Sequence, residues 1–178
     1  MRQTVCMLLI STVLLSACGF HLRGKIDLPP SLETIRITSP DGDLRTYLAD
    51  ALDFSGATVT GSDDGALLDV VDVRFERRVR TVDTRGLATS YMLHYAVDFR
   101  VEDASGASLL DSATINLKRD FNFDSTQVLE KEDEEQFLRD DMRRAAAQRI
   151  VRRIGTVGAA QADSTPGAET QGAVEPAY

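Results

Sequence analysis

The sequence predicts an α+β fold, a two-layer sandwich in which a mainly antiparallel sheet of four to five strands carries two helices on one face. Three long segments alternate apolar and polar residues, as half-buried strands do. Two other segments repeat apolar residues with the period of a helix. Because the alternating segments are apolar on one side only, we expect the helices to cover that side.

The three alternating segments lie in the middle of the chain and predict an antiparallel meander. They span residues 67–80, 87–102 and 109–121, and residues 103–106 form a hairpin turn between the last two. Residues 32–38 predict a further strand, and residues 57–60 a short strand at best. The predicted core face carries the following side chains: Leu67, Val71, Val73, Phe75 and Val79, then Leu87, Tyr91, Leu93, Tyr95, Val97, Phe99 and Val101, then Leu109, Ala113, Ile115, Leu117 and Phe121.

The two helical segments flank this meander. Asp41 or Asp43 is the expected N-cap of the first helix, residues 44–54. The second covers residues 131–154, or begins two residues earlier, and Gly155 is expected to end it. Acidic residues gather near its start and arginines toward its end, which suits the helix dipole. The predicted core stripes are Leu44, Tyr47, Leu48, Ala51 and Leu52 on the first helix and Leu138, Met142, Ala146, Ile150 and Ile154 on the second, widened there by Phe137, Ala145 and Val151.

The N-terminus has the pattern of a secretory signal. Arg2 precedes an apolar run that ends at Leu15, and the small pair Ser16-Ala17 comes directly before Cys18. The run is too short to cross a bilayer as a helix, which takes roughly 20 residues. Leu-Ser-Ala-Cys resembles the bacterial lipobox, which implies an S-diacylglycerol and an N-acyl chain on Cys18 after cleavage. The alternative is an ordinary signal peptide with a cysteine at the junction.

These features divide the chain into four parts. Residues 1–17 are the expected signal peptide, which is removed, and residues 18–31 an extended, lipidated anchor and stem. Residues 32–155 form the α+β domain, and residues 156–178, which have almost no large apolar side chain, a disordered tail. Cys18 is the one cysteine after the signal, so we expect no disulfide, no cysteine-based metal site and no cofactor beyond its covalent lipid.

The composition argues against nucleic-acid binding and against catalysis. The formal net charge is −8, and an exported protein does not meet nucleic acid. His21 and His94 are the two histidines and fit no metal-ligand spacing. Nucleophile-elbow and phosphate-loop motifs are absent from the sequence. The acidic run 130–135 is better explained by the helix dipole than by a calcium loop. We therefore expect a non-enzymatic protein.

One segment runs against the acidic average. Residues 74–85 hold five arginines. Arg74, Arg78 and Arg80 project from the polar face of one strand, and Arg85 lies in the turn after it. Guanidinium groups match phosphate geometry, so this edge is a candidate for a phosphorylated lipid head group. The alternative is a solvated face whose arginines pair with Asp98, Glu102 or Asp120 across the sheet.

Several stretches together resemble a known family. Cys18-Gly-Phe-His-Leu-Arg is followed by the stem Leu28-Pro-Pro-Ser, and Ala88-Thr-Ser-Tyr-Met-Leu opens a central strand. Lys118-Arg-Asp-Phe-Asn-Phe then precedes the last helix with its Met142-Arg-Arg-Ala-Ala. In this order, over residues 15–154, the chain resembles the LPS-assembly lipoprotein family (LptE).

The resemblance implies a location and two partners. Members of this family plug a large outer-membrane β-barrel, LptD, assist its assembly and help to deliver lipopolysaccharide to the cell surface. Gly19, where aspartate marks inner-membrane retention, favours a lipid anchor on the periplasmic side of the outer membrane. The family's basic lipopolysaccharide-binding position matches Lys131, and Arg85 lies about one residue from a second, with Arg78 and Arg80 as further candidates. The alternative function is a stand-alone, periplasm-facing lipoprotein that binds a lipid or cell-wall fragment.

Overall fold

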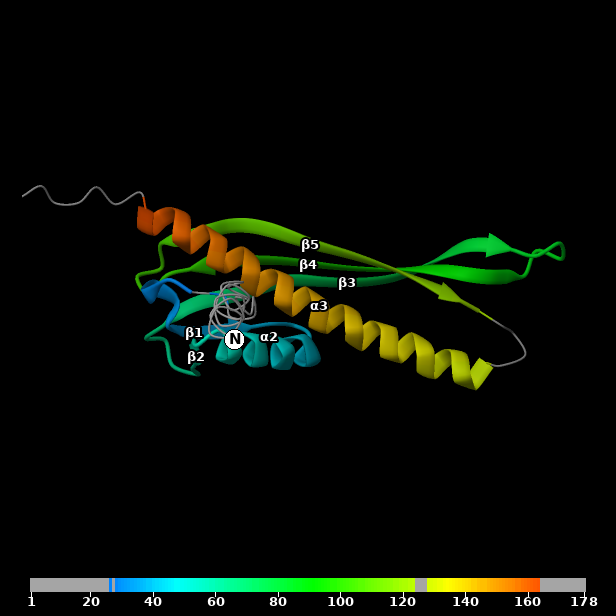
Figure 1. Ribbon diagram of the computed structural model, residues 1–178, viewed down its shortest axis with the longest axis horizontal. Coiled ribbons are helices and arrows are strands. Elements are labelled where there is room, and N and C mark those ends of the chain that lie inside the picture. Colours follow the sequence, from blue (N-terminus) through cyan, green and yellow to red (C-terminus); the bar gives the residue numbers. More distant parts are fainter. Residues whose placement is uncertain (1–25, 27, 124–127, 164–178) are drawn as a thin grey trace, which may run out of the picture.

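The computed structural model describes residues 26, 28–123 and 128–163 and confirms the α+β class (Figure 1). Its elements are η1 (Pro30–Leu32), β1 (Thr34–Thr38), α2 (Gly42–Phe54), β2 (Thr58–Val59), β3 (Ala66–Val82), β4 (Ala88–Glu102), β5 (Ser108–Asn122) and α3 (Val128–Asp163). They form one five-stranded sheet in the order β2-β1-β3-β4-β5. β1 pairs in parallel with β2 and β3, and the β3-β4-β5 meander is antiparallel.

One hydrophobic core joins the sheet to both helices. Leu44, Leu48 and Leu52 of α2 are fully buried, as the predicted stripe requires. Inward side chains of β1, β3 and β4 and the C-terminal half of α3 complete the same cluster, including Ile35, Leu68, Leu93, Val97, Phe99, Met142, Ala146, Ile150 and Ile154. Because both helices share this cluster with one face of the sheet, the predicted two-layer arrangement is confirmed.

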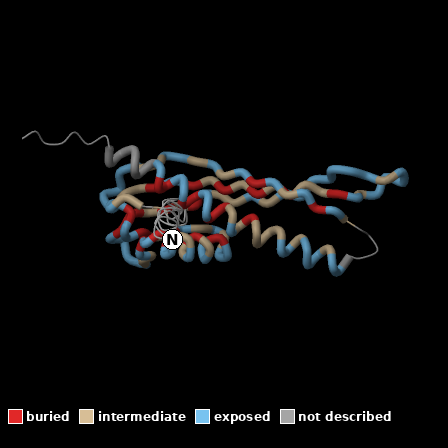
Figure 2. The backbone as a smooth tube through the Cα atoms, viewed as in Figure 1, coloured by how far each residue is buried: buried red, intermediate tan, exposed pale blue. Residues whose placement is uncertain are grey.

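The molecule is elongated, and its two ends differ in burial. Buried residues concentrate where α2 and the C-terminal half of α3 cover the sheet (Figure 2). Beyond α2 the meander continues as a long, narrow extension beside the N-terminal half of α3 (Figure 1). We call the far end of this extension, with the turn 83–87 and the start of α3, the distal end. Only the first turns of α3 accompany the sheet there, so its inner face is poorly covered.

A β-bulge in β3 corrects the predicted core face of that strand. The register passes from Val70 opposite Phe99 to Asp72 opposite Asp98, which leaves Val71 as an extra residue. The alternation therefore changes phase at this point. Before the bulge the buried residues are Ala66, Leu68 and Val70, so the prediction of Leu67 and Val71 as core residues is wrong. After the bulge the prediction is correct for Val73 and Phe75, which pack against the core.

Other core-face predictions are wrong in the extension and in the N-terminal half of α3. Val79, Leu87 and Phe137, all expected in the core, are 58%, 52% and 70% exposed. Their alternation or helical stripe is real, but α2 begins near the middle of the molecule and runs away from the extension, so it does not cover this part of the sheet (Figure 1). Periodicity reports which face a residue lies on, and burial also needs a neighbouring layer.

Two predicted boundaries also change. α3 does not end at Gly155 but continues to Asp163. Glycine inside a helix costs only about 1 kcal/mol relative to alanine, and the buried neighbours Ile154 and Val151 hold this turn against the core. Residues 156–163, predicted as disordered, are thus helical, and 164–178 lie outside the described residues. Pro30–Leu32 forms a single 3₁₀ turn instead of extended stem. The predicted signal peptide and Cys18 also lie outside the described residues.

Candidate functional site

An aromatic cluster occupies the inner face of the distal end. Tyr91 and Phe121 are register partners on β4 and β5, and their ring centroids are 6.2 Å apart. Phe123 meets Tyr91 edge-on at 5.6 Å, and its backbone N–H donates to the Thr89 carbonyl at 3.0 Å. Such aromatic pairs contribute about 0.5–1.5 kcal/mol beyond simple burial. The cluster therefore gives this thin part of the fold a small core of its own.

Two cations lie over these rings. The Arg77 guanidinium carbon is 4.8 Å from the Tyr91 ring centroid, and Lys131 Nζ is 6.0 Å from that of Phe121. Each cation also has a carboxylate on α3. Arg77 lies 2.7 Å from Glu135, and Lys131 lies 2.6 Å from Glu134. Lys131 is thus placed on the inner face, with 19% of its side chain exposed.

Arg85 lies at the tip of the β3-β4 hairpin. Gly86, with φ of +82°, forms the turn, and Asp83 accepts hydrogen bonds from the backbone N–H groups of Leu87 and Arg85 at 2.9 and 2.8 Å. The Arg85 guanidinium donates to the other Asp83 oxygen at 2.9 Å. These bonds, that of Leu87 first, hold the pKa of Asp83 below its usual value. The Arg85 side chain is 75% exposed and faces solvent.

Arg78 and Arg80 lie on the outer face of the sheet. Arg80 pairs with Asp120 on β5, and Arg78 pairs with Glu76 on its own strand. Arg74 lies 2.7 Å from Asp98. The structure therefore realises the expected cross-strand pairing for Arg74 and Arg80. It also places Arg78 and Arg80 on the face opposite Lys131, with Arg85 at the tip between them.

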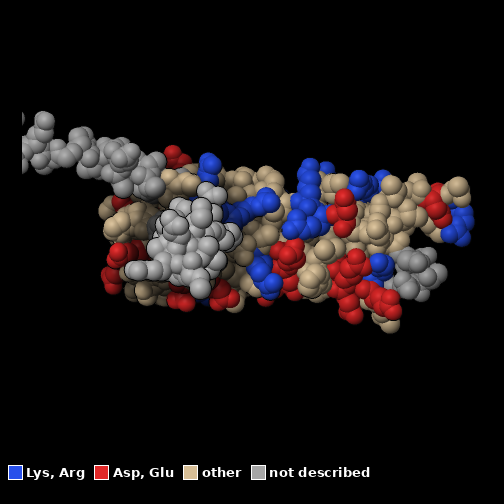
Figure 3. Space-filling view, viewed as in Figure 1, with Lys and Arg blue, Asp and Glu red and all other residues tan. Residues whose placement is uncertain are grey.

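Figure 3 shows acidic and basic side chains interspersed at the distal end instead of a single positive patch. The extension and the N-terminal half of α3 also expose five large apolar side chains. These are Val79, Val82, Leu87, Leu129 and Phe137, between 52% and 78% exposed. Large exposed apolar side chains that form a contiguous patch typically mark an interaction site, so these residues are candidates for a contact surface.

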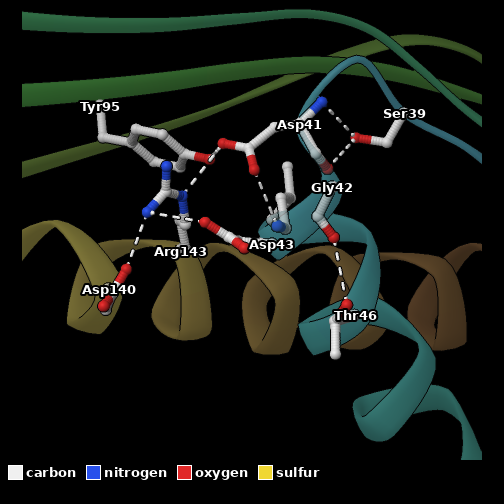
Figure 4. A network of polar contacts seen from close by, with 9 residues as sticks. Ser39, Asp41, Gly42, Asp43, Thr46, Tyr95, Asp140 and Arg143 are labelled. Carbon is white, nitrogen blue, oxygen red and sulfur yellow. Dashed lines mark hydrogen bonds and ion pairs between the residues drawn. The ribbon is translucent and has the colours of Figure 1, made fainter.

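A polar network at the middle of α3 holds the two helices together (Figure 4). Asp41 caps α2 by accepting the Leu44 N–H at 3.0 Å, so the first of the two predicted caps is correct. Its other oxygen accepts from Arg143 Nε at 3.0 Å. Burial opposes ionisation of Asp41, but the bonds from Leu44 and Arg143 outweigh it and lower its pKa.

The opposite side of this network is Tyr95, whose hydroxyl lies 3.5 Å from Asp41. Burial and the nearby Asp41 charge raise the pKa of Tyr95, so the phenol stays neutral. Arg143 also reaches Asp140 at 2.7 Å and Asp43 at 3.4 Å. The charged groups of this network are therefore all ion-paired, and the network fixes α2 against α3. None of its named residues is held ready for proton transfer.

Two other kinds of site are absent from the described part of the chain. Within residues 26, 28–123 and 128–163, no three histidine, cysteine or carboxylate side chains gather closely enough to hold a metal ion. None of the described helices is both long and apolar enough to span a bilayer.

The fold is shared with a class of bacterial lipoproteins of known structure. Lipoprotein B from Nitrosomonas europaea superposes with a TM-score of 0.68 at 29% identity, over 82% of this chain and 96% of that one. The rare lipoprotein B from Shewanella oneidensis gives a TM-score of 0.64 at 22% identity, over 72% of this chain and 98% of that one, which supports the fold alone.

The sequence comparisons identify the family within this class. The family model described as LptE, lipopolysaccharide-assembly, matches residues 32–154. The LPS-assembly lipoprotein LptE of Yersinia enterocolitica is 31% identical over 90% of this chain and 80% of its own length. That of Photorhabdus laumondii is 29% identical over 88% of both chains. The chain therefore belongs to the LptE family, and its role is lipopolysaccharide assembly, not catalysis.

Proposed function

We propose that this chain is an outer-membrane lipoprotein, anchored through Cys18 on the periplasmic side, that acts as a plug and assembly partner of the β-barrel LptD. The observation that carries the proposal is the family match across residues 32–154, which includes every described strand of the sheet. The Leu-Ser-Ala-Cys motif before the domain supplies the expected anchor.

The shape of the domain supports a role as a plug. The meander and α3 build a long, narrow body (Figure 1). Its distal end presents Leu129, which is 78% exposed, and the N-terminal half of α3 presents Phe137, which is 70% exposed. A surface of apolar anchors with a charged surround suits a protein interface. Such an end can insert into a barrel lumen, where apolar anchors bind and charges set the orientation.

Direct contact with lipopolysaccharide is the second part of the proposal. Arg85 and Lys131 belong to the same distal end, and phosphate groups of the lipid are suitable ligands for both cations. Arg85 is the more accessible, since its side chain is 75% exposed and its one carboxylate neighbour among the described residues is Asp83. Lys131 must leave Glu134 to bind a phosphate. The outer-face cations Arg78 and Arg80 form a separate candidate site.

Co-purification tests the barrel partnership. The full chain, extracted from membranes in mild detergent, is expected to bring down a β-barrel protein at near one-to-one stoichiometry. A Cys18→Ser variant is expected to lose its lipid and its membrane fraction, because the thioether bond cannot form. A lipidated chain that isolates without any barrel, yet binds lipid A by itself, would refute the partnership and favour the stand-alone lipoprotein.

Charge reversal tests the lipid contact separately. Arg85→Glu with Lys131→Glu is expected to weaken lipopolysaccharide binding by about tenfold or more, since each lost charge-assisted bond is worth roughly 1.5–3 kcal/mol. The barrel complex is expected to survive. Arg78→Glu with Arg80→Glu is the matched control on the outer face. A larger loss in that control would move the site to the outer face.

A further inference from the structure

A second candidate site lies away from the distal end, between the sheet and the two helices. A pocket of about 310 Å³ opens beside the network of Figure 4. Its lining comes from the loop before α2, from β3 and β4, and from α3. This volume is at the lower end of the range for small-molecule sites. The pocket has a charged side and an apolar side, and these are made by different residues.

The apolar side is formed by Pro40, Val73 and Phe75. Val73 and Phe75 follow the β-bulge and face the helices, packed against the core from one side. Arg139 of α3 lies over the Phe75 ring, with its guanidinium carbon 4.0 Å from the ring centroid. The guanidinium therefore covers this face of the ring, and the two side chains are neighbours in the pocket lining.

Arg139 is the cation of this wall that its surroundings compensate least. Its ion pair with Glu135 spans 3.6 Å, and Arg77 holds the same carboxylate at 2.7 Å. Its Nε atom is buried and has no hydrogen-bond partner among the described residues. The guanidinium is therefore incompletely hydrogen-bonded and only weakly ion-paired, so an anion at its terminal nitrogens would gain a charge-assisted bond. The side chain is 35% exposed, which leaves its terminal nitrogens accessible.

The other charged side chains that line the pocket already have ion-pair partners. Arg143 is bound by three carboxylates, those of Asp41, Asp43 and Asp140. Asp72, at the rim, pairs with Arg74 of the outer face. A small anion that enters the pocket therefore meets Arg139 as the cation with the weakest ion pairing, beside Asp41 and Asp72, which pair with Arg143 and Arg74. Its charged end is directed to Arg139, and its apolar part to Phe75 and Val73.

We infer that this pocket binds a small anionic ligand, a carboxylate or a phosphate joined to an apolar group, with Arg139 as its anion partner and Val73 and Phe75 as its apolar wall. Neither the barrel partner nor the distal cations take part in it. The inference can thus fail while the proposed function holds, and the proposed function can fail while the inference holds.

Calorimetric titration of the full chain in non-ionic detergent tests the site with three probes. Phenyl phosphate and phenylacetate carry the two anionic head groups on one ring, and benzyl alcohol carries none. We expect saturable one-to-one binding of at least one anion and at least about tenfold weaker binding of the alcohol, because the charge-assisted bond is lost. The anion that binds with the higher affinity shows whether the pocket prefers a phosphate or a carboxylate. The absence of saturable binding for both anions would overturn the inference.

Variants assign the binding to Arg139. Arg139→Gln is expected to weaken the better probe by about tenfold. Arg139→Lys keeps the charge but loses the planar fork, so binding is expected to fall less. Arg144→Gln is the matched control. Arg144 is on the same helix as Arg139, α3, but it does not line the pocket; its guanidinium carbon lies 5.3 Å from the ring centroid of Tyr47 on α2. Equal affinity of both Arg139 variants and the wild type would contradict the assignment, and thermal unfolding verifies that each is folded.

Discussion

Arg143 Nε lies 3.0 Å from Asp41 Oδ2 and joins the first turn of α2 to the middle of α3, across 102 positions of the chain. Both side chains are largely buried, with 14% and 16% exposed. The same carboxylate caps α2, so one residue starts the helix correctly and also fixes its position against α3. A contact of this kind makes the helix layer one unit over the sheet.

Removal of this carboxylate is expected to destabilise the domain measurably. Asp41→Ala loses an N-cap, which costs about 1 kcal/mol, and leaves Arg143 without its most buried partner. We expect a total loss of about 2–4 kcal/mol in the free energy of unfolding, measured by urea denaturation. Asp43→Ala is the matched control, because Asp43 is 69% exposed and 3.4 Å from Arg143. We expect less than about 1 kcal/mol there. Equal losses in both variants would contradict the role given to Asp41.

The same residue gives stability a defined pH dependence. The pKa of Asp41 is lowered from its ordinary value of 3.8, so the folded state binds this proton less readily than the unfolded chain. The charged form therefore stabilises the fold above pH 3.8, and this contribution is lost as pH falls through the lowered folded value. Urea unfolding from neutral pH down into acid below this value should show wild type and Asp41→Asn converging. A constant gap over that interval would show that the charge is not responsible.

Gly65 is expected to tolerate no side chain. A Cβ placed there would lie 2.7 Å from the Thr34 carbonyl oxygen, because β1 passes directly beside the start of β3. Gly65→Ala must therefore displace backbone, and we expect a loss of about 1–3 kcal/mol. A Cβ added to Gly61, in the same loop, would have nothing within 4 Å, and its φ is not positive. Gly61→Ala should change the unfolding free energy by less than about 0.5 kcal/mol. A neutral Gly65→Ala would show that β1 can shift.

Local patterns were sufficient for most of the fold and failed where a neighbour decides the outcome. The α2 stripe and its cap follow from spacing and side-chain chemistry near Asp41, and the long alternations of β4 and β5 required no further information. The bulge at Val71 could not be predicted, since a one-residue insertion is visible only against the partner strand. Gly155 is a reasonable helix end in isolation, but burial against the core carries α3 past it.

The candidate site also has residues that the sequence could select and features that only the structure reveals. Arg85 and Lys131 could be selected because the family resemblance marks them, and both lie at the distal end. The sequence offered Asp98, Glu102 and Asp120 as cross-strand partners of the arginines, but which of them pairs with Arg80 depends on how β3, β4 and β5 are aligned. The pocket at Arg139 could not be predicted from the sequence either, because its walls come from segments that are distant in the chain.

Phe137 and Leu138 are neighbours on one turn of α3, one on the exposed surface and one against the core. Phe137 is 70% exposed, whereas Leu138 packs against the core cluster. Phe137→Gln is therefore expected to change the unfolding free energy by less than about 0.5 kcal/mol, and Leu138→Gln to cost about 2 kcal/mol or more. If the distal end and the N-terminal half of α3 dock into the barrel, Phe137→Gln should lower co-purification with LptD severalfold in a chain that is still fully stable. Unchanged recovery of the barrel, with stability also unchanged, would remove Phe137 from the contact surface and leave Leu129 and Leu87 as the residues to test next.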